Sequence, residues 1–191
     1  MEGALAALKS LARELGASGA ASVSPESVTI RDDLAAVCAN PRCPYYGLGA
    51  SCPPHVPGPP AMRTWLAQAR GVLVARMDVP SAVLLSAQRK EVLSVLHETV
   101  AAIEARARDL GFTRSRAFAG GSCKTMFCRG HARCAVAEGG ECRNPDRARP
   151  SMSGFGVDVE AMVHSAGWPM DPGPGDGGES MMSVFGMVLL A

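Results

Sequence analysis

Hydrophobic residues recur at three- and four-residue intervals in several parts of the chain, a period typical of helices with one buried face. Residues 2–15 place four leucines at these intervals, and Gly16 follows as a helix stop. The longest such stretch is residues 81–110, with Ser81 as its predicted N-cap. Its apolar stripe consists of Val92, Leu96, Val100, Ile103, Ala107 and Leu110. One shorter helix is predicted to end at residues 65–69. Another is predicted over residues 158–166, with Asp158 as its N-cap.

Short apolar runs bounded by Gly or Pro predict the strands. The clearest is residues 71–78, and the others are residues 20–23, 28–30, 115–119 and 184–190. Residues 32–37 fit either a strand or a helical turn. The pattern predicts an α/β (α+β) fold, in which a small sheet is flanked by helices. The length of 191 residues indicates a single domain over residues 1–191.

Two segments with little helix or strand character interrupt this pattern, residues 38–60 and 120–152. Residues 38–60 alone contain seven prolines and three glycines, so they are predicted to form a loop. All seven cysteines lie in the two segments: Cys38, Cys43 and Cys52 in the first, and Cys123, Cys128, Cys134 and Cys142 in the second. Thiolates are the preferred ligands of zinc and of iron–sulfur clusters. The seven cysteines are therefore predicted to bind metal.

The cellular setting favours metal ligation over disulfides. No N-terminal signal peptide is recognisable, and no apolar run approaches the roughly 20 residues that span a bilayer. A cytoplasmic protein is expected, and in that compartment thiols stay reduced. An odd number of cysteines also argues against complete pairing.

Charge and composition limit the classes of binding partner to be expected. The net charge is +1 and aromatic residues make up 5% of the chain, so neither a basic face nor a set of stacking platforms is indicated. Nucleic acid and membranes are therefore not expected as partners. A redox partner protein or a small-molecule substrate is the expectation that remains.

The first cysteine segment has the spacing Cys38-x4-Cys43-x8-Cys52. Proline follows two of these cysteines directly, which fixes φ and directs the chain away from a metal. Two glycines before Cys52 permit close approach of backbone amides to sulfur. Three cysteines leave one ligand position open, for His55, for a cysteine of the second segment, for water or for a substrate.

The second segment has the spacing Cys123-x4-Cys128-x5-Cys134-x7-Cys142. Four thiolates are the number that a [4Fe–4S] cluster or a structural zinc ion requires. The spacings match neither the C-x2-C pairs of zinc ribbons nor the tight run of bacterial ferredoxins. An iron–sulfur cluster is the first interpretation and zinc is the alternative, with His131 as an additional ligand or neighbour of a ligand.

Basic residues gather around the second segment, with six Lys or Arg against three Asp or Glu over residues 124–149. Such cations would offset the negative charge of a four-thiolate cluster. They are equally compatible with ordinary solvation of a loop. The sequence leaves both interpretations open.

Two blocks of this sequence resemble the DUF2284 family of predicted metal-binding proteins. The first block is Cys43, Pro44, Tyr46, Gly47, Cys52, Pro53 and Pro54. The second is Cys142, Arg143, Pro145, Ala148, Arg149, Pro150, Ser151, Met152, Gly156, Asp158 and Val159, followed by Gly167 and Trp168. The resemblance extends over nearly the whole chain and implies metal binding through the cysteines, with iron–sulfur as the expected chemistry. It implies no particular reaction.

Three functions are compatible with these features. The first is an iron–sulfur protein with one or two [4Fe–4S] clusters, acting in electron transfer or in small-molecule chemistry at an open iron. The second is an interaction module stabilised by zinc, and the third is a carrier of metal or clusters. The sequence contains no Ser-His-Asp order, phosphate-binding loop or paired carboxylates, so hydrolase and nucleotide-binding functions have no support.

Overall fold

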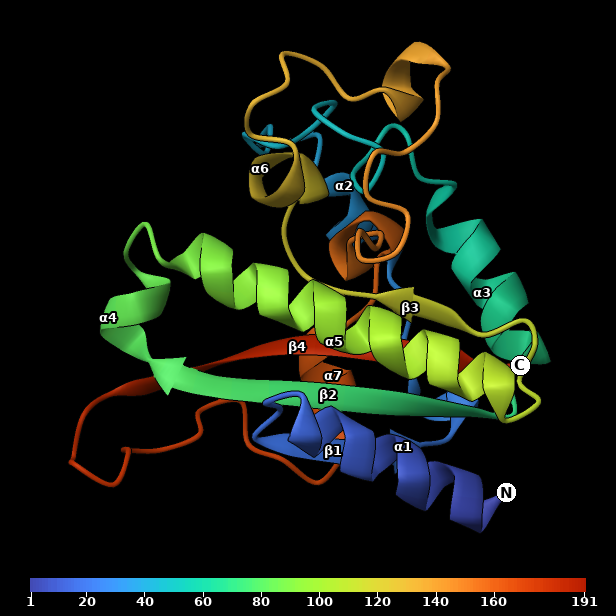
Figure 1. The fold of residues 1–191 in the computed structure, drawn as a ribbon, viewed down its shortest axis with the longest axis vertical. Coiled ribbons are helices and arrows are strands. Elements are labelled where there is room, and N and C mark those ends of the chain that lie inside the picture. The colour runs from blue at the N-terminus through green and yellow to red at the C-terminus, as the bar shows by residue number, and fades with distance from the viewer.

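The computed structural model describes all 191 residues, and its centre is one antiparallel sheet with the strand order β1-β2-β4-β3 (Figure 1). The strands are β1 (Gly19–Val23), β2 (Gly71–Pro80), β3 (Arg116–Phe118) and β4 (Met181–Leu190). The two long strands β2 and β4 pair along their whole length, with Gly71 opposite Leu190 and Pro80 opposite Met181. The C-terminal strand therefore lies in the middle of the sheet.

Helices cover both faces of this sheet. Helices α1 (Glu2–Glu14) and α5 (Arg89–Asp109) cover one face, and α3 (Gly58–Gln68), η3 (Met152–Phe155) and α7 (Val159–Ser165) cover the other. The central strand β2 explains why both faces are buried. Its side chains alternate, so that Leu73 and Met77 pack under α5 while Val72 and Val74 pack under α3. A strand buried on both sides is expected to be an apolar run, and β2 is one over residues 72–75.

The remaining short elements belong to the end of the molecule that carries the cysteines, or connect the main ones. They are η1 (Pro25–Ser27), α2 (Asp32–Ala36), α4 (Ser81–Leu84), α6 (Cys123–Phe127) and η2 (Val136–Glu138). Figure 1 shows α2, α6 and the two cysteine segments gathered above α5, away from both chain termini. No helix of the structure is long and apolar enough to cross a membrane.

The predicted fold class is confirmed, and most predicted elements are present with small shifts of their ends. Residues 28–30 are the exception among the strands, because Ile30 makes only one isolated bridge, to Val157. Residues 32–37, left open between strand and helical turn, form the helix α2. The loop predicted over residues 38–60 ends earlier than expected, since α3 begins at Gly58. Pro59 and Pro60, which follow Gly58, lie in the first turn of α3. Backbone N–H groups there have no partner within the helix, so a proline at these positions removes no helical hydrogen bond.

The helix predicted over residues 81–110 is two helices, α4 and α5, separated at residues 85–88. The side chain of Ser86 accounts for the break. Its hydroxyl donates to the Val83 carbonyl and accepts from the Gln88 amide, which gives the backbone an alternative to helical hydrogen bonds. The prediction that Ser81 caps a helix was wrong: Ser81 is already helical, and its hydroxyl bonds to that of Ser180.

Candidate metal centre

The two cysteine segments meet beside the β3 edge of the sheet, where backbone hydrogen bonds join them (Figure 1). The first runs from α2 to α3, and the second leaves the sheet after β3 and returns at η3. Ala119 and Ser151, at the start and end of the second segment, form a parallel bridge. The Ser151 amide also donates to the Ser51 carbonyl oxygen at 2.8 Å. The middle of the first segment is therefore fixed against both ends of the second.

Ser51 lies between the two groups of cysteines. It is 4% exposed, and its hydroxyl accepts a hydrogen bond from the Cys123 amide at 3.1 Å. The same hydroxyl is 3.7 Å from the Cys52 sulfur. Cys52 and Cys123 are both buried, so the two cysteine groups are neighbours inside the protein.

The three cysteines of the first segment line one cavity, called here the three-thiol cavity. Its volume is about 230 Å³. Besides Cys38, Cys43 and Cys52, its lining consists of Tyr45, Tyr46, Pro53, Arg89, Gly121, Ser151 and Ser153. The cavity is therefore formed by both cysteine segments, the start of α5 and the start of η3.

The four cysteines of the second segment line a separate and much smaller space, the four-thiol cavity, of about 20 Å³. Cys123, Cys128, Cys134 and Cys142 share this space with mainly apolar neighbours, including Phe127 and Val136. Gly49 and Ala50 of the first segment close its inner side: Ala50 lines the cavity, and a Cβ at Gly49 would lie 3.0 Å from that of Lys124. The structure thus sorts the seven cysteines into a group of three and a group of four.

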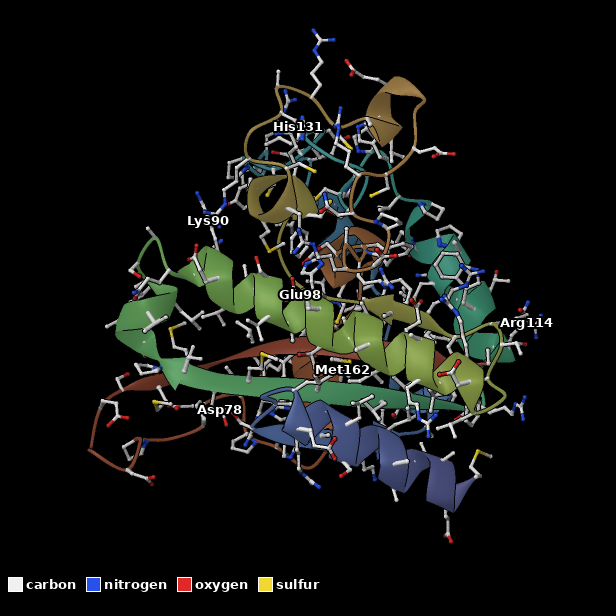
Figure 2. All side chains as sticks on the ribbon, in the orientation of Figure 1. Asp78, Lys90, Glu98, Arg114, His131 and Met162 are labelled. Carbon is white, nitrogen blue, oxygen red and sulfur yellow. The ribbon has the colours of Figure 1, made fainter.

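No three Cys, His, Asp or Glu side chains converge closely enough to surround a single metal ion. The thiols of each group face a shared space instead of a common point. The two candidate histidines line neither cavity. His55 is exposed, with its ring nitrogen 3.3 Å from the Gly47 carbonyl oxygen, and His131 is exposed on the outer part of the second segment (Figure 2).

Burial and hydrogen bonding affect the thiols in opposite directions. Burial raises the pKa values of Cys38, Cys52 and Cys123 above the ordinary thiol value. Burial acts on Cys134 in the same direction, yet its pKa is lowered on balance. Backbone amides of Ala137, Ala50 and Val136, together with the charge of Arg143, favour its thiolate.

Further donors point at the sulfurs. The Asn144 side-chain amide donates to the Cys128 sulfur at 3.2 Å, and its backbone N–H donates to the Cys142 sulfur at 3.4 Å. One residue thus serves two thiols of the four-thiol cavity. Between the two cavities, the Ser122 hydroxyl is buried without a hydrogen-bond partner and stands near Cys52. A buried hydroxyl of this kind is a donor available to a thiolate.

The six basic residues around the second segment divide into two sets. Lys124 and Arg143 line the four-thiol cavity. Lys124 also donates to the carbonyl oxygens of Cys128 and His131, which fixes the turn between them. The other four each form an ion pair: Arg129 with Glu91, Arg133 with Glu138, Arg147 with Glu98, and Arg149 with Glu104. Two of the six cations therefore lie beside the four cysteines, and the other four are paired with glutamates.

A buried network on α5 supports the second cysteine segment from below. Glu104 is 5% exposed and accepts hydrogen bonds from the Ala117 amide at 2.9 Å and from the Arg149 guanidinium at 2.9 Å. Arg149 in turn donates to the carbonyl oxygens of Pro145 and Ala148. Its role is to hold the returning end of the segment on α5, so it is not free to contact a substrate.

His97 belongs to the same network and is completely buried. Its Nε2 bonds to the Gly120 carbonyl oxygen at 2.9 Å, and its Nδ1 accepts from the Arg149 amide at 3.1 Å. One ring nitrogen donates and the other accepts, so the imidazole is neutral. Burial lowers the pKa of His97 to about 4, and the charge of Arg149 acts in the same direction, against the Gly120 hydrogen bond. His97 therefore joins the two ends of the second segment without titrating near neutral pH.

Several of these residues were not singled out by sequence reasoning. Ser51, Asn144 and Glu104 have no motif of their own, and each acts through contacts with residues distant in the sequence. For Asn144 one signal was available, because it lies two residues after Cys142, where a side chain can reach a ligand. For Ser51 and Glu104 the sequence carries no comparable signal.

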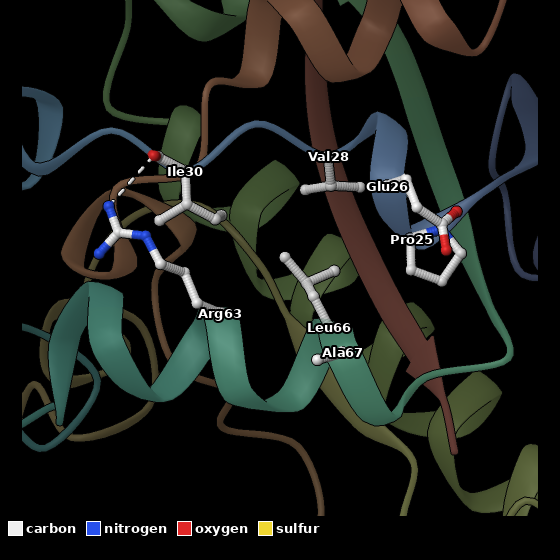
Figure 3. A pocket seen from close by; sticks show the side chains of 7 residues that line it. All are labelled: Pro25, Glu26, Val28, Ile30, Arg63, Leu66 and Ala67. Atoms are coloured by element: carbon white, nitrogen blue, oxygen red, sulfur yellow. Dashed lines mark hydrogen bonds between the residues drawn. The ribbon is translucent and has the colours of Figure 1, made fainter.

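A further groove lies away from the cysteines, between η1 and α3 (Figure 3). It has a volume of about 250 Å³, and its floor contains Val28, Ile30 and Leu66. The one cation that lines it, Arg63, is already bound to Asp32 and to the Ile30 carbonyl oxygen. This groove contains no thiol and is separate from both cysteine cavities.

Comparison with known proteins identifies the family of this chain. Neither the curated proteins nor the solved structures yield a match to this chain. A family model described as "Predicted metal-binding protein (DUF2284)" matches residues 21–190, which include both cysteine segments and all four strands except the first two residues of β1. With the match covering nearly the whole chain, this protein belongs to the DUF2284 family of predicted metal-binding proteins.

Proposed function

We propose that this chain is an iron–sulfur protein with two neighbouring sites. One site is the four-thiol cavity, where Cys123, Cys128, Cys134 and Cys142 would hold a [4Fe–4S] cluster. The other is the three-thiol cavity, where Cys38, Cys43 and Cys52 would hold a second cluster with one position open. The observation that carries the proposal is the division of seven thiols into a group of four and an adjacent group of three.

The four-thiol cavity fits such a cluster in the chemistry of its donors. All its candidate ligands are cysteines, and no histidine lines it. Amides of Asn144 and of the chain around Cys134 donate to sulfur, and Lys124 and Arg143 supply positive charge. These groups stabilise an anionic thiolate centre. The space of about 20 Å³ means that the outer loop with Cys134 and exposed Cys142 has to widen when a cluster binds.

The arrangement of the thiols favours a cluster over zinc. A single zinc ion binds sulfur at about 2.3 Å, which requires four sulfurs roughly 3.8 Å apart around one point. No three of the thiols converge on one point, so the preformed geometry of a structural zinc site is absent.

The three-thiol cavity differs in having room beside its thiols. Its volume of about 230 Å³ adjoins three cysteines, and the orphan Ser122 hydroxyl stands near Cys52 as a further donor to sulfur. When bound, a cluster with three cysteine ligands offers an iron that exchanges ligands and acts as a Lewis acid or redox centre, whereas a four-thiolate cluster only carries electrons. We therefore propose small-molecule redox chemistry at the three-thiol cavity.

The closeness of the two sites supports a redox function in particular. Cys52 and Cys123 are separated by Ser51, which touches both through its hydroxyl. Two electron-carrying centres on either side of one buried residue are suited to exchange electrons. A structural module would have no need for this contact.

Metal analysis after anaerobic purification tests the proposal. Iron, zinc and acid-labile sulfide are determined per chain, together with the absorption spectrum. About eight irons with matching sulfide are expected, since a [4Fe–4S] cluster contains four of each. About four irons would reduce the proposal to one site. Zinc without sulfide would overturn it and leave a zinc-stabilised interaction module.

A further inference from the structure

The three-thiol cavity opens into a larger apolar groove on the surface. This groove has a volume of about 460 Å³ and shares Cys38, Cys43 and Ser153 with the cavity. Most of its remaining lining is apolar, namely Leu34, Val37, Val157 and Val159. A molecule bound beside the thiols therefore has an apolar surface on which to extend.

Arg89 supplies a positive charge to the lining of the three-thiol cavity. It is the first residue of α5 and lines the three-thiol cavity but not the groove. Its guanidinium is exposed and forms neither a hydrogen bond nor an ion pair within the chain. By contrast, Arg129, Arg147 and Arg149 are paired with glutamates. Arg42 stacks on the ring of Tyr46 and does not itself line the cavity.

The position of Arg89 at the start of a helix adds to its charge. The N-terminus of a helix carries partial positive charge, so a cation there is unfavourable unless an anion is close. The only acidic residue in the first turn of α5, Glu91, is bound to Arg129. Unneutralised positive charge thus faces a cavity that also holds three thiols.

The charged residues that line the groove are acidic. Asp158 and Glu160 line it. Asp158 caps α7 and pairs with Arg31, whereas Glu160 has no partner. An anionic group is repelled in the groove and attracted at Arg89.

We propose that the three-thiol cavity binds a small organic anion, with its charged group at Arg89 and its apolar part over Val37 and Val157. The Arg89 guanidinium presents parallel donors that match a carboxylate or a phosphate. Tyr45, Tyr46 and Ser153, which carry hydroxyls, line the same cavity. A small organic anion is thus the substrate class proposed for the three-thiol site. The inference rests on the proposed function only for the chemistry that follows binding.

Calorimetric titration of the purified, metal-loaded protein tests the inference with hexanoate, hexyl phosphate and neutral hexanamide. At least one anion is expected to bind saturably, and hexanamide is not. Arg89→Met is expected to weaken anion binding about tenfold or more, as loss of a charge-assisted hydrogen bond does. The anion affinity of Arg89→Lys should lie between those of the wild type and Arg89→Met, because lysine keeps the charge but lacks the parallel donors of the guanidinium. Lys90→Met is the matched control, since Lys90 is the adjacent cation on α5 and lines neither space.

Equal binding of hexanamide, unchanged binding by Arg89→Met, or no binding at all would overturn the inference. Each variant changes an exposed side chain, so folding is preserved and a loss of binding is interpretable. The relative affinities of hexanoate and hexyl phosphate identify which anion is preferred. If metal analysis finds clusters and no anion binds, only this inference fails. If it finds zinc without sulfide, the proposed redox function fails, and the titration still decides whether Arg89 and the cavity bind anions.

Discussion

Ser51 shows how much at this site depends on single side chains. Through one hydroxyl and one carbonyl it contacts Cys52, Cys123 and Ser151, which belong to different parts of the chain. Its carbonyl fixes the end of the second cysteine segment, and its hydroxyl fixes the start. At the scale of residues, the two thiol groups are therefore coupled in position, although their ligand sets are separate.

Substitution of single cysteines is expected to separate the two sites. Cys128→Ser should remove about four irons per chain from the four-thiol site and leave the cluster of the three-thiol site. Cys43→Ser should remove the cluster of the three-thiol site and leave that of the four-thiol site. Iron and sulfide content with the absorption spectrum measures this. His131→Ala is the matched control, expected to retain all metal because His131 is exposed and lines neither cavity. Loss of all iron in either cysteine variant would show a single shared site.

The buried ion pair of Glu104 and Arg149 gives a second prediction. Glu104→Gln is expected to lower the free energy of unfolding by about 3 kcal/mol, because it leaves a buried guanidinium without its counter-charge. Urea denaturation measures the change. Glu98→Gln is the control on the same helix: its pair with Arg147 is about half exposed, and a change under about 1 kcal/mol is expected. Equal effects of the two variants would contradict the structural role of the network.

His97 gives a prediction about pH. Burial holds its pKa at about 4, against an ordinary value of 6.5, so the unfolded chain binds a proton that the folded protein does not. Its contribution to stability is complete above about pH 6.5 and declines as the pH falls toward 4, by roughly 3 kcal/mol in total. The measurement is the difference in unfolding free energy between wild type and His97→Gln at several pH values. That difference should shrink on acidification, and a difference that does not change with pH would contradict the prediction.

At the scale of elements, the segment around η3 places the first cysteine segment. Residues 29–31, before α2, pair with residues 156–158, after η3: the Arg31 amide donates to the Gly156 carbonyl oxygen at 2.8 Å, and the Asp158 amide to that of Thr29 at 2.9 Å. Helix α2, which leads directly to Cys38, is positioned by this pairing. Gly154 contributes by allowing close approach, since a Cβ there would lie 2.9 Å from Pro53 and Val56.

Gly156→Ala is expected to disturb this arrangement. Gly156 has φ of +70°, and a Cβ there would collide with the Arg31 carbonyl oxygen. The left-handed backbone alone costs about 1–2 kcal/mol for alanine. Thermal unfolding should show this loss, and iron analysis a selective loss from the three-thiol site. Gly130→Ala, with no atom near its Cβ, is the control and should be neutral. An unchanged Gly156→Ala protein would exclude this role for η3.

At the scale of the whole molecule, the sheet and its two cores do not depend on the cysteines. The cluster under α1 and α5 has 18 buried residues and the cluster under α3 and α7 has 15, and neither includes a cysteine. Proteins whose metal supplies the folding energy have no such core. The metal is therefore expected to order one end of the molecule, with the rest folded independently.

Removal of metal by a chelator tests this. The far-UV circular dichroism and a cooperative unfolding transition should persist, because the cores remain buried. Limited proteolysis should become faster at residues 38–57 and 128–149, and stay slow in the sheet. The metal-loaded protein is the control. Complete loss of secondary structure on chelation would instead indicate a fold that depends on metal.

The pattern of apolar residues was sufficient for most of the fold, and for physical reasons. Strands β2 and β4 contain apolar runs over residues 72–75 and 185–190, because these parts of the strands are buried. The prediction failed where a local hydrogen bond decided the outcome, as when Ser86 divides α4 from α5. It failed also at residues 28–30, where a single isolated bridge, between Ile30 and Val157, forms in place of a strand. A strand requires a partner, and the partner is not visible in the segment itself.

The sequence by itself determined the fold class, the family and the seven candidate ligands, because periodicity and thiol chemistry are properties of the residues. Only the tertiary structure decided how the cysteines divide, with three around one cavity and four around another. It also decided that Ser51 lies between them and that Arg89 faces the three-thiol cavity. These are contacts between residues far apart in the chain, and packing, which no local pattern records, sets them.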